Sequence, residues 1–398
     1  MESTAVVEAP VEFKCPLEVS VELNKLLAVY KKWLYIHEDY AIVGPICAVI
    51  ANFDPGDPDI WGVIGPSGSL KTEVLRSFGK VPNDWIYPIS NLTEHTFISG
   101  LDKSTESDII PNLNMRMIII KDLTTILAKE QKIRGQIFAD FRDIIDGYMK
   151  KDFGNKVHKS YDDIHSSILF ACTNEIEKYY SMYSALGQRI LFMRPRNDND
   201  KAAARAEEIS DDVRQMRREI ADATAVFMKE VVWDKLPTIT DEQRKEMREY
   251  YKLLAVVRTA VDHDYCGNIE NLPEPESPTR IAKSINRMIR IHAMIYGRSE
   301  VIQEDLNFGL RIVYDNIPMK RLKVLESICD EKHPVYKTVD ISDRIKLGLQ
   351  TTRKILGDLE ALRIMDHVSD GREGSNMYQI VDKFVIPLFS ILKSKACE

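Results

Sequence analysis

IWGVIGPSGSLKT, residues 60–72, is the stretch that decides the fold. The apolar residues 60–64 predict a β-strand and TEVLRSFG, from residue 72, predicts a helix, so a loop rich in glycine and serine joins the two. Such a loop can turn consecutive backbone N–H groups toward phosphates, and the N-terminus of the following helix adds positive potential. The candidate nucleotide-binding residues are Gly65, Pro66, Ser67, Gly68, Ser69, Leu70, Lys71 and Thr72.

Lys71 and Thr72 complete the phosphate-loop pattern G-x-x-x-x-G-K-[ST] with one departure. Lys71 would neutralise the β- and γ-phosphates of ATP, and the Thr72 hydroxyl would hold Mg²⁺. Leu70 stands where the pattern has its second glycine, so its side chain must point away from the nucleotide. An ordinary strand-to-helix turn could carry the same sequence, and this segment alone leaves that alternative open.

Further apolar runs alternate with helical patterns around this loop. Near-continuous runs of this kind are typical of a parallel sheet buried on both faces. They are IWGVI at 60–64, WIYPI at 85–89, MIIIK at 117–121, SILFACT at 167–173 and ILFMR at 190–194. We therefore predict an α/β fold in which residues 1–200 hold N-terminal helices and a parallel-sheet nucleotide-binding core.

Two other regions follow this core. Residues 201–321 read as long charged helices with apolar residues at three- and four-residue spacing, which predicts an all-helical lid. Residues 322–398 contain two short helical stretches, a stronger helix over 351–362, and two short segments around a glycine turn at 371–374. Three helices followed by a hairpin predict a winged helix-turn-helix domain.

Asp122 directly follows the run MIIIK, and a carboxylate at the end of such a strand can hold Mg²⁺ through water beside a phosphate loop. A buried strand that merely ends in an exposed Asp would look the same. Leu123 occupies the position where a water-polarising Glu is usual. Hydrolysis would then be slow or need another base, and the candidates are Glu130, Asp143 and Asp146.

Two other polar residues flank predicted strands. Asn174 follows SILFACT and could orient the attacking water or touch the γ-phosphate. Arg189 follows Leu-Gly-Gln and precedes a strand, so it could project into a neighbouring subunit's nucleotide as an arginine finger. Taken alone, Arg189 could equally be a surface cation.

Several of these motifs occur in the order found in AAA+ ATPases. GPSGSLKT, IIIKD, ACTN, LGQR and Pro-Thr-Arg at 278–280 resemble the phosphate loop, Walker B strand, sensor 1, arginine finger and sensor 2 of that family. The chain over residues 34–316 further resembles AAA+ ATPases of phages and mobile elements, which look like distant relatives of minichromosome-maintenance-type replicative helicases.

The resemblance implies a five-stranded parallel sheet, a helical lid, and a ring or filament in which each nucleotide lies between subunits. By position, Asp122 would assist the metal, Asn174 would be sensor 1, Arg189 would act in trans and Arg280 would be sensor 2. Two more arginines on the helix that Arg280 opens, at 287 and 290, are expected to be surface or interface charges, and His292 is expected to be structural.

Residues 149–161 form the first candidate DNA-binding segment. They carry four lysines against one acid, with an Asp-Phe-Gly-Asn turn that predicts a hairpin. Lysines supply sequence-independent, salt-dependent attraction to phosphates. In the helicases that the chain resembles, a hairpin before sensor 1 projects into the ring channel and grips DNA, which makes Lys151, Lys156 and Lys159 candidates. An ordinary solvated loop is the alternative.

The tail holds the second candidate. The helix over 351–362 would place Arg353 and Lys354 near its N-terminus, where a recognition helix reaches base edges, and Arg372 would lie on the wing. The charge balance of the tail is close to neutral, so binding of a partner protein stays open as an alternative.

The composition and the longest apolar run limit which classes of protein remain possible. A net charge of −7 excludes coating of nucleic acid by bulk charge. The longest apolar run, Ala41–Ala51, is too short to cross a bilayer. We expect no signal peptide, and the six scattered cysteines favour reduced thiols in a cytoplasmic protein.

The sequence thus predicts an oligomeric, Mg²⁺-dependent and DNA-dependent ATPase that is helicase-like or remodels single-stranded or duplex DNA, in replication of a phage or mobile element. The departures at Leu70 and Leu123 motivate an alternative, a nucleotide-switched DNA-binding regulator or defence component with little turnover. A structural adaptor with a degenerate site is the third hypothesis.

Overall fold

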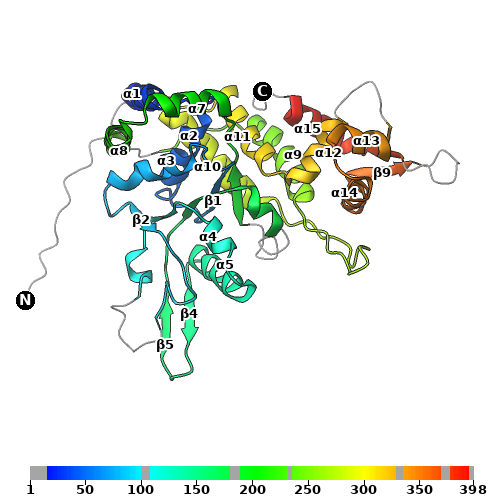
Figure 1. The fold of residues 1–398 in the computed structure, drawn as a ribbon, viewed down its shortest axis with the longest axis horizontal. Helices are drawn as coiled ribbons and strands as arrows, with labels where there is room; N and C mark the ends of the chain where they lie inside the picture. Colours follow the sequence, from blue (N-terminus) through cyan, green and yellow to red (C-terminus); the bar gives the residue numbers. More distant parts are fainter. Residues whose placement is uncertain are drawn as a thin grey trace, which may run out of the picture.

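Five parallel strands form the central sheet, in the order β2-β3-β6-β1-β7 (Figure 1). They are β1 (Ile60–Ile64), β2 (Ile86–Ile89), β3 (Met117–Ile120), β6 (Ile168–Cys172) and β7 (Ile190–Met193). The structure is a computed structural model that describes residues 16–99, 108–179, 189–231, 235–328, 335–368 and 377–393. The predicted α/β fold with a parallel sheet is confirmed, with every predicted strand found within a residue or two of its expected bounds.

Alternate residues of the strands face two separate hydrophobic clusters. Trp61 and Val63 point into a cluster formed with α1 (Pro16–Trp33), α2 (Tyr40–Ala51), α3 (Lys71–Ser77), α8 (Val213–Glu230) and α10 (Thr279–Ile295). Ile60 and Ile64 point into the other, formed with α4 (Thr124–Leu127) and α5 (Gln131–Ile145). Because both faces are covered, the strands read as unbroken apolar runs rather than as alternating patterns.

Helices that follow β7 in the sequence pack against the helices that cover the sheet. α7 (Asn199–Glu208) has no buried residue, whereas α8 buries Met216, Ile220 and Phe227 along one face and packs against α1 and α3. α9 (Asp241–Val257) and α11 (Gln303–Asp315) pack against α10, which itself lies against α2. The apolar run Ala41–Ala51 is thus a buried helix of the core. Within the described residues, no helix is both long and apolar enough to span a membrane.

An antiparallel hairpin projects from the sheet at the bottom of Figure 1, which confirms the hairpin predicted in residues 149–161. Its strands are β4 (Met149–Asp152) and β5 (His158–Tyr161). At the tip, Phe153 N–H donates to Val157 O and Lys156 N–H donates to Phe153 O, and Lys156 adopts a left-handed φ of 64°. A tight turn closed by one left-handed residue is a common way to join two strands.

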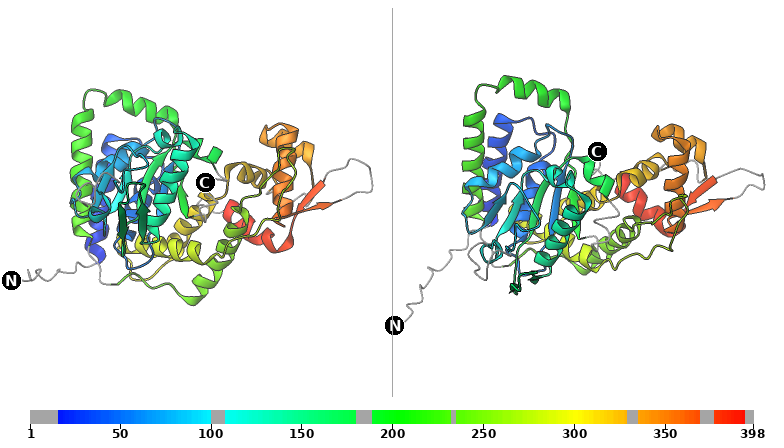
Figure 2. Two further views of the ribbon diagram at one scale, coloured as in Figure 1. Left: turned by 90° about the horizontal axis from the view of Figure 1, so that it is seen from below. Right: turned by 60° about the horizontal axis from the view of Figure 1, so that its bottom comes forward.

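The C-terminal elements lie at the opposite end of the molecule from α1 and α8 (Figures 1 and 2). They comprise α12 (Met319–Ser327), α13 (Thr338–Ile345), α14 (Leu349–Ala361) and a three-stranded antiparallel sheet in the order β8-β10-β9. The strands are β8 (Tyr336–Lys337), β9 (Met365–Val368) and β10 (Met377–Ile380), and α15 (Asp382–Lys393) follows them. The predicted helices and strand pair are therefore present, together with β8 and α15, which the sequence did not predict. The glycine turn at 371–374, with Arg372, lies outside the described residues.

Candidate nucleotide site and the opposite edge of the sheet

The loop 65–70 lies at the carboxyl edge of the sheet, by which we mean the edge at which the parallel strands end. Gly65 N–H donates to Cys172 O at 3.2 Å, which ties the loop to the end of β6. Gly68 has a φ of 79°, a left-handed conformation that favours glycine, and open space surrounds the position that a Cβ would take. The loop is therefore held at its start and open at its middle, as a phosphate cradle requires.

Lys71 begins α3 and folds back over this loop. Its Nζ donates to Pro66 O at 2.5 Å and to Ser69 Oγ at 2.9 Å. The residue is 6% exposed, and burial lowers the pKa of its ammonium while the nearby Asp122 carboxylate opposes that shift. The Lys71 ammonium is thus held over the loop by Pro66 and Ser69.

Asp122 and Asn174 reach the same edge from neighbouring strands. Asp122 follows β3, and its exposed carboxylate accepts a hydrogen bond from Thr124 N–H at 2.9 Å. Asn174 is exposed and begins the 3₁₀ turn η3 (Asn174–Tyr179) directly beyond β6. Because β6 lies between β1 and β3, the structure brings together four predicted residues at this edge, Lys71, Thr72, Asp122 and Asn174.

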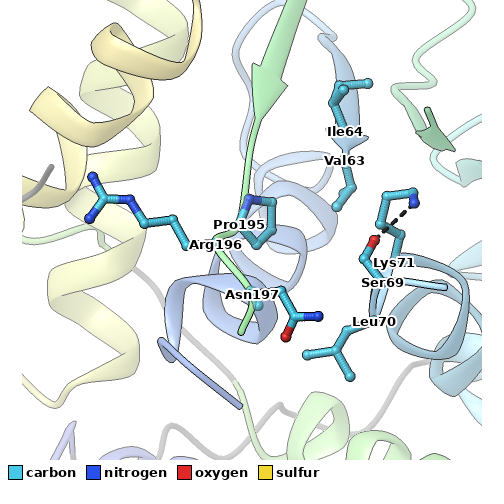
Figure 3. Close-up of a pocket in the computed structure, with 9 residues that line it drawn as sticks. Val63, Ile64, Ser69, Leu70, Lys71, Pro195, Arg196 and Asn197 are labelled. Carbon is cyan, nitrogen blue, oxygen red and sulfur yellow. Dashed lines mark hydrogen bonds between the residues drawn. The ribbon is translucent and has the colours of Figure 1, made fainter. Parts of the chain in front are cut away.

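Leu70 lies away from the Lys71 side chain. It caps α3 in an ordinary right-handed conformation, with φ −55° and ψ −13°, so its backbone does not need glycine. Figure 3 shows Leu70 directed toward Asn197, while Lys71 extends to the other side and meets Ser69. Leu70 is partly buried and packs against the hydrophobic core, on the side opposite the Lys71 ammonium.

Arg189 and Arg280 lie at the amino edge of the sheet, where the strands begin. Arg189 precedes β7 and pairs with Asp146, and the strand register sets Ile190 opposite Ile60 at the start of β1. Arg280 is exposed in the first turn of α10. Burial raises the pKa of the Glu276 carboxyl, and the charges of Arg258, Arg280 and Arg189 oppose that rise. The two predicted arginines therefore share the neighbourhood of Glu276, across the sheet from Lys71.

The three candidate bases are divided between these two edges. Asp146 caps the C-terminal end of α5 and pairs with Arg189. Asp143 lies one turn earlier, and burial raises the pKa of its carboxyl. Glu130 caps the other end of α5, just after α4, and is exposed. Of the three, Glu130 alone lies on the side of Asp122.

The hairpin lysines divide into buried and exposed residues. Lys159 Nζ lies 2.8 Å from Asp108 Oδ2, and both side chains are at most 3% exposed. Lys151 Nζ lies 2.8 Å from Asp140 Oδ2 and donates to a backbone carbonyl at 3.2 Å. These two lysines anchor the hairpin to the core, which corrects the expectation that they present charge at its surface. Lys156, at the tip, is exposed, as is Lys150 in β4.

Arg353 and Lys354 are both exposed near the start of α14. Lys354 lines a hollow of about 210 Å³ together with Glu177, Pro318, Met319 and Asp358. Asp358, one turn further along α14, lies 3.3 Å from Arg321 and 3.0 Å from His263. The side of α14 that carries Lys354 therefore faces the rest of the chain. Of the two predicted residues, Arg353 is the one that does not line the hollow.

Arg287 and Arg290 differ from the expectation that they are surface charges. Arg287 is 6% exposed and lies 3.4 Å from Asp54, while Arg290 donates to the carbonyls of Leu236 and Pro237 at 3.1 and 2.7 Å. The spacing 280, 283, 287, 290 places four cations on one helical face, but it does not show that their partners lie in distant segments. His292 is buried beside Asp305 at 2.7 Å, which agrees with a structural role.

The described residues contain no group of three or more His, Cys, Asp or Glu side chains that could hold a metal ion. A Mg²⁺ ion at Thr72 and Asp122 would consequently depend on phosphate oxygens and water for its other ligands. No protein-family model matches the chain, and no curated protein sequence matches it significantly.

Proposed function

We propose that the protein binds and hydrolyses ATP with Mg²⁺ and acts on DNA as an oligomer, as a helicase-like or DNA-remodelling ATPase. The observation that carries this proposal is the meeting of Lys71, Thr72, Asp122 and Asn174 at the carboxyl edge of a parallel sheet. The Lys71 ammonium donates to two neutral oxygens, Pro66 O and Ser69 Oγ. The charged phosphate oxygens of ATP would replace them as acceptors. Thr72 and Asp122 would hold Mg²⁺, which when bound neutralises phosphate charge.

The amino-edge arginines support an oligomeric form of this proposal. Arg189 and Arg280 are separated from their own loop by at least the length of β1, about 16 Å for five residues. Any contact that they make with a nucleotide would therefore be with one bound to a neighbouring subunit. On this proposal, Arg189 exchanges Asp146 for the γ-phosphate of the neighbour when subunits assemble.

The exposed face of the hairpin is the part best suited to DNA. Lys150 and Lys156 are exposed, and in the part of the chain that the structure describes neither pairs with a buried acid. Lys151 and Lys159, by contrast, form ion pairs with Asp140 and Asp108. Arg353 remains the candidate on α14. We also propose, as part of this function, that the C-terminal elements form a winged-helix domain.

ATPase assays with and without single-stranded, duplex and forked DNA test this function, together with the mass of the protein in a nonhydrolysable ATP analogue. We expect an oligomer in the presence of the analogue and a hydrolysis rate that rises when DNA is added. An oligomer that hydrolyses ATP at one rate with every DNA would refute the DNA-dependent part.

One observation favours the second candidate, a nucleotide-switched DNA-binding regulator or defence component with little turnover. Leu123 is fully buried where a catalytic Glu is usual, and two of the three other candidate bases lie at the amino edge. This function predicts ATP-dependent assembly or duplex binding with negligible phosphate release. Robust turnover would count against it.

A further inference from the structure

We propose that a second pocket, separate from the loop 65–70, binds a phosphate-bearing ligand. The pocket has a volume of about 540 Å³ and lies between α9, α10 and the loop before β1. Its charged lining residues are Arg244, Lys283, Arg287, Arg290, Asp54 and Asp57. This inference goes beyond the proposed function and does not depend on it.

The cations come from one continuous helical stripe and one residue opposite. Lys283, Arg287 and Arg290 recur at spacings of four and three residues, so they share a face of α10. Arg280 continues the same face by one turn, and the stripe from 280 to 290 is about 15 Å long. Arg244 faces it from the first turn of α9.

Much of this positive charge is available for a ligand. Among the described residues, neither Arg244 nor Arg290 forms an ion pair, and Arg290 has only the neutral carbonyls of Leu236 and Pro237 as acceptors. Lys283 pairs with Asp57 at 2.8 Å, but the two side chains are 59% and 69% exposed. An exposed pair of this kind contributes little and exchanges readily for a more highly charged partner.

Arg287 is held in a fixed position at the base of the pocket. Its guanidinium lies 3.4 Å from Asp54 and 3.8 Å from Asp59, and it donates to Ala51 O. A Cβ at Gly56 would lie 2.0 Å from Arg287 Nη2, so a larger residue there would displace the end of this side chain. Arg287 therefore places a guanidinium at the pocket wall through its contacts with two carboxylates and a carbonyl.

The charge and size indicate the class of ligand. Four cationic side chains face two carboxylates on the lining, and Asp59, which lies 3.8 Å from Arg287 just outside it, leaves a net surplus of one positive charge. The volume lies within the roughly 300–1,000 Å³ that is usual for small-molecule sites. Arginine forks match phosphate oxygens, so the expected ligand carries at least two phosphate charges. Its source is either a free polyphosphate, such as that of a nucleotide, or successive phosphates of a nucleic-acid strand.

The test uses the full chain carrying Lys71→Ala, so that the loop 65–70 no longer contributes, and tripolyphosphate as the probe in isothermal titration. We expect one saturable site, and about tenfold weaker binding when Arg244→Ala is added, because that substitution removes one charge-assisted hydrogen bond. Arg244 is exposed, so the substitution should leave thermal unfolding unchanged. Lys245→Ala, at an exposed neighbour that does not line the pocket, is the matched control and should change nothing.

A short single-stranded oligonucleotide that displaces tripolyphosphate would assign the site to a nucleic-acid backbone, and failure to displace it would assign the site to a free polyphosphate. The proposal is overturned if the Lys71→Ala protein does not bind tripolyphosphate, or if Arg244→Ala and Lys283→Ala leave the affinity unchanged. Because the readout is binding in a protein with an altered phosphate loop, failure of the ATPase proposal would not affect it.

Discussion

Leu123→Glu would introduce the residue that usually follows the Walker B aspartate in AAA+ ATPases, the family that the sequence motifs resemble, and it tests the site directly. Leu123 is 0% exposed within the cluster between the sheet and α4 and α5, and its N–H donates to Ala171 O at 2.8 Å. A carboxylate here would lie in the core rather than beside a nucleotide. We therefore expect the substitution to destabilise the fold without creating a catalytic base.

The magnitude has two parts at pH 5. Loss of a buried leucine costs about 1.5–3 kcal/mol, and an unpaired buried carboxyl group adds about 1–3 kcal/mol. Together they reduce the free energy of unfolding by about 2.5–6 kcal/mol. Since small proteins have only about 5–15 kcal/mol in total, the effect is large.

The dependence of this destabilisation on pH would identify burial of the carboxyl group as its cause. Burial raises the pKa of a carboxyl group in the folded state above its unfolded value of about 4.3. Between pH 5 and pH 7, the carboxyl group at position 123 is ionised in the unfolded chain and stays protonated in the folded chain. The difference from the wild-type protein should therefore grow by about 1.36 kcal/mol per pH unit, or about 2.7 kcal/mol over this range.

Urea unfolding at pH 5 and pH 7 measures both parts, with ATP hydrolysis assayed in parallel. Thr125→Glu, two residues away on the exposed side of α4, adds the same charge without burial and should stay within about 0.5 kcal/mol of wild type. Leu123→Met should cost less than about 1.5 kcal/mol at either pH. A Leu123→Glu protein that is as stable as wild type at both pH values and hydrolyses ATP faster would refute our placement of this side chain.

Lys71→Ala should remove the rise in melting temperature that ATP confers, because the ammonium over the loop supplies the main phosphate contact; an unchanged rise would place ATP elsewhere. Arg189→Ala should abolish hydrolysis yet bind ATP, and mixing it with Lys71→Ala protein should restore part of the activity; two variants that stay inactive when mixed would contradict action in trans. Lys156→Asn keeps a residue that tolerates the left-handed turn and should lower the salt slope of DNA binding by about 1 with no change in melting temperature, whereas an equal slope would remove the tip from the interface. Lys159→Met should cost about 3–5 kcal/mol of stability because it leaves the buried Asp108 carboxylate without its cation, with only the hydrogen bonds from Ser99 N–H and the Tyr161 hydroxyl, and a neutral result would contradict the buried pair.

The strands and the loop between β1 and α3 could be predicted because the information is local. A strand covered on both faces must be apolar throughout, so IWGVI and SILFACT were recognisable without any knowledge of their neighbours. Lys71 and Asp122 could be singled out as candidates because each lies shortly after such a strand in the sequence. The parallel order of the strands then brings those ends to one edge.

The roles of the hairpin lysines could not be predicted in the same way. Lys159 and Asp108 are far apart in sequence, and nothing in the composition of residues 149–161 distinguishes a lysine that pairs with a buried acid from one that faces solvent. The alternation of the hairpin strands, with Lys159 inward and Lys156 at the tip, depends on register. Arg287 posed a similar problem, because its partners come from the loop before β1.

Helix α5 links parts of the molecule that have been described separately. Its first turn contacts η3 through Arg134, which lies 4.3 Å from the ring of Tyr179, and its C-terminal cap pairs with Arg189. Between them, Asp140 holds Lys151 of the hairpin at 2.8 Å. The helix is about 22 Å long, so a small tilt at its first turn becomes a larger displacement at the hairpin and at the amino edge. Moving the hairpin independently of α5 would break the largely buried Lys151–Asp140 ion pair, at a cost of about 3–5 kcal/mol. The buried Lys159–Asp108 pair ties the hairpin to the segment before β3 as well, so we expect α5, the hairpin and that segment to move together.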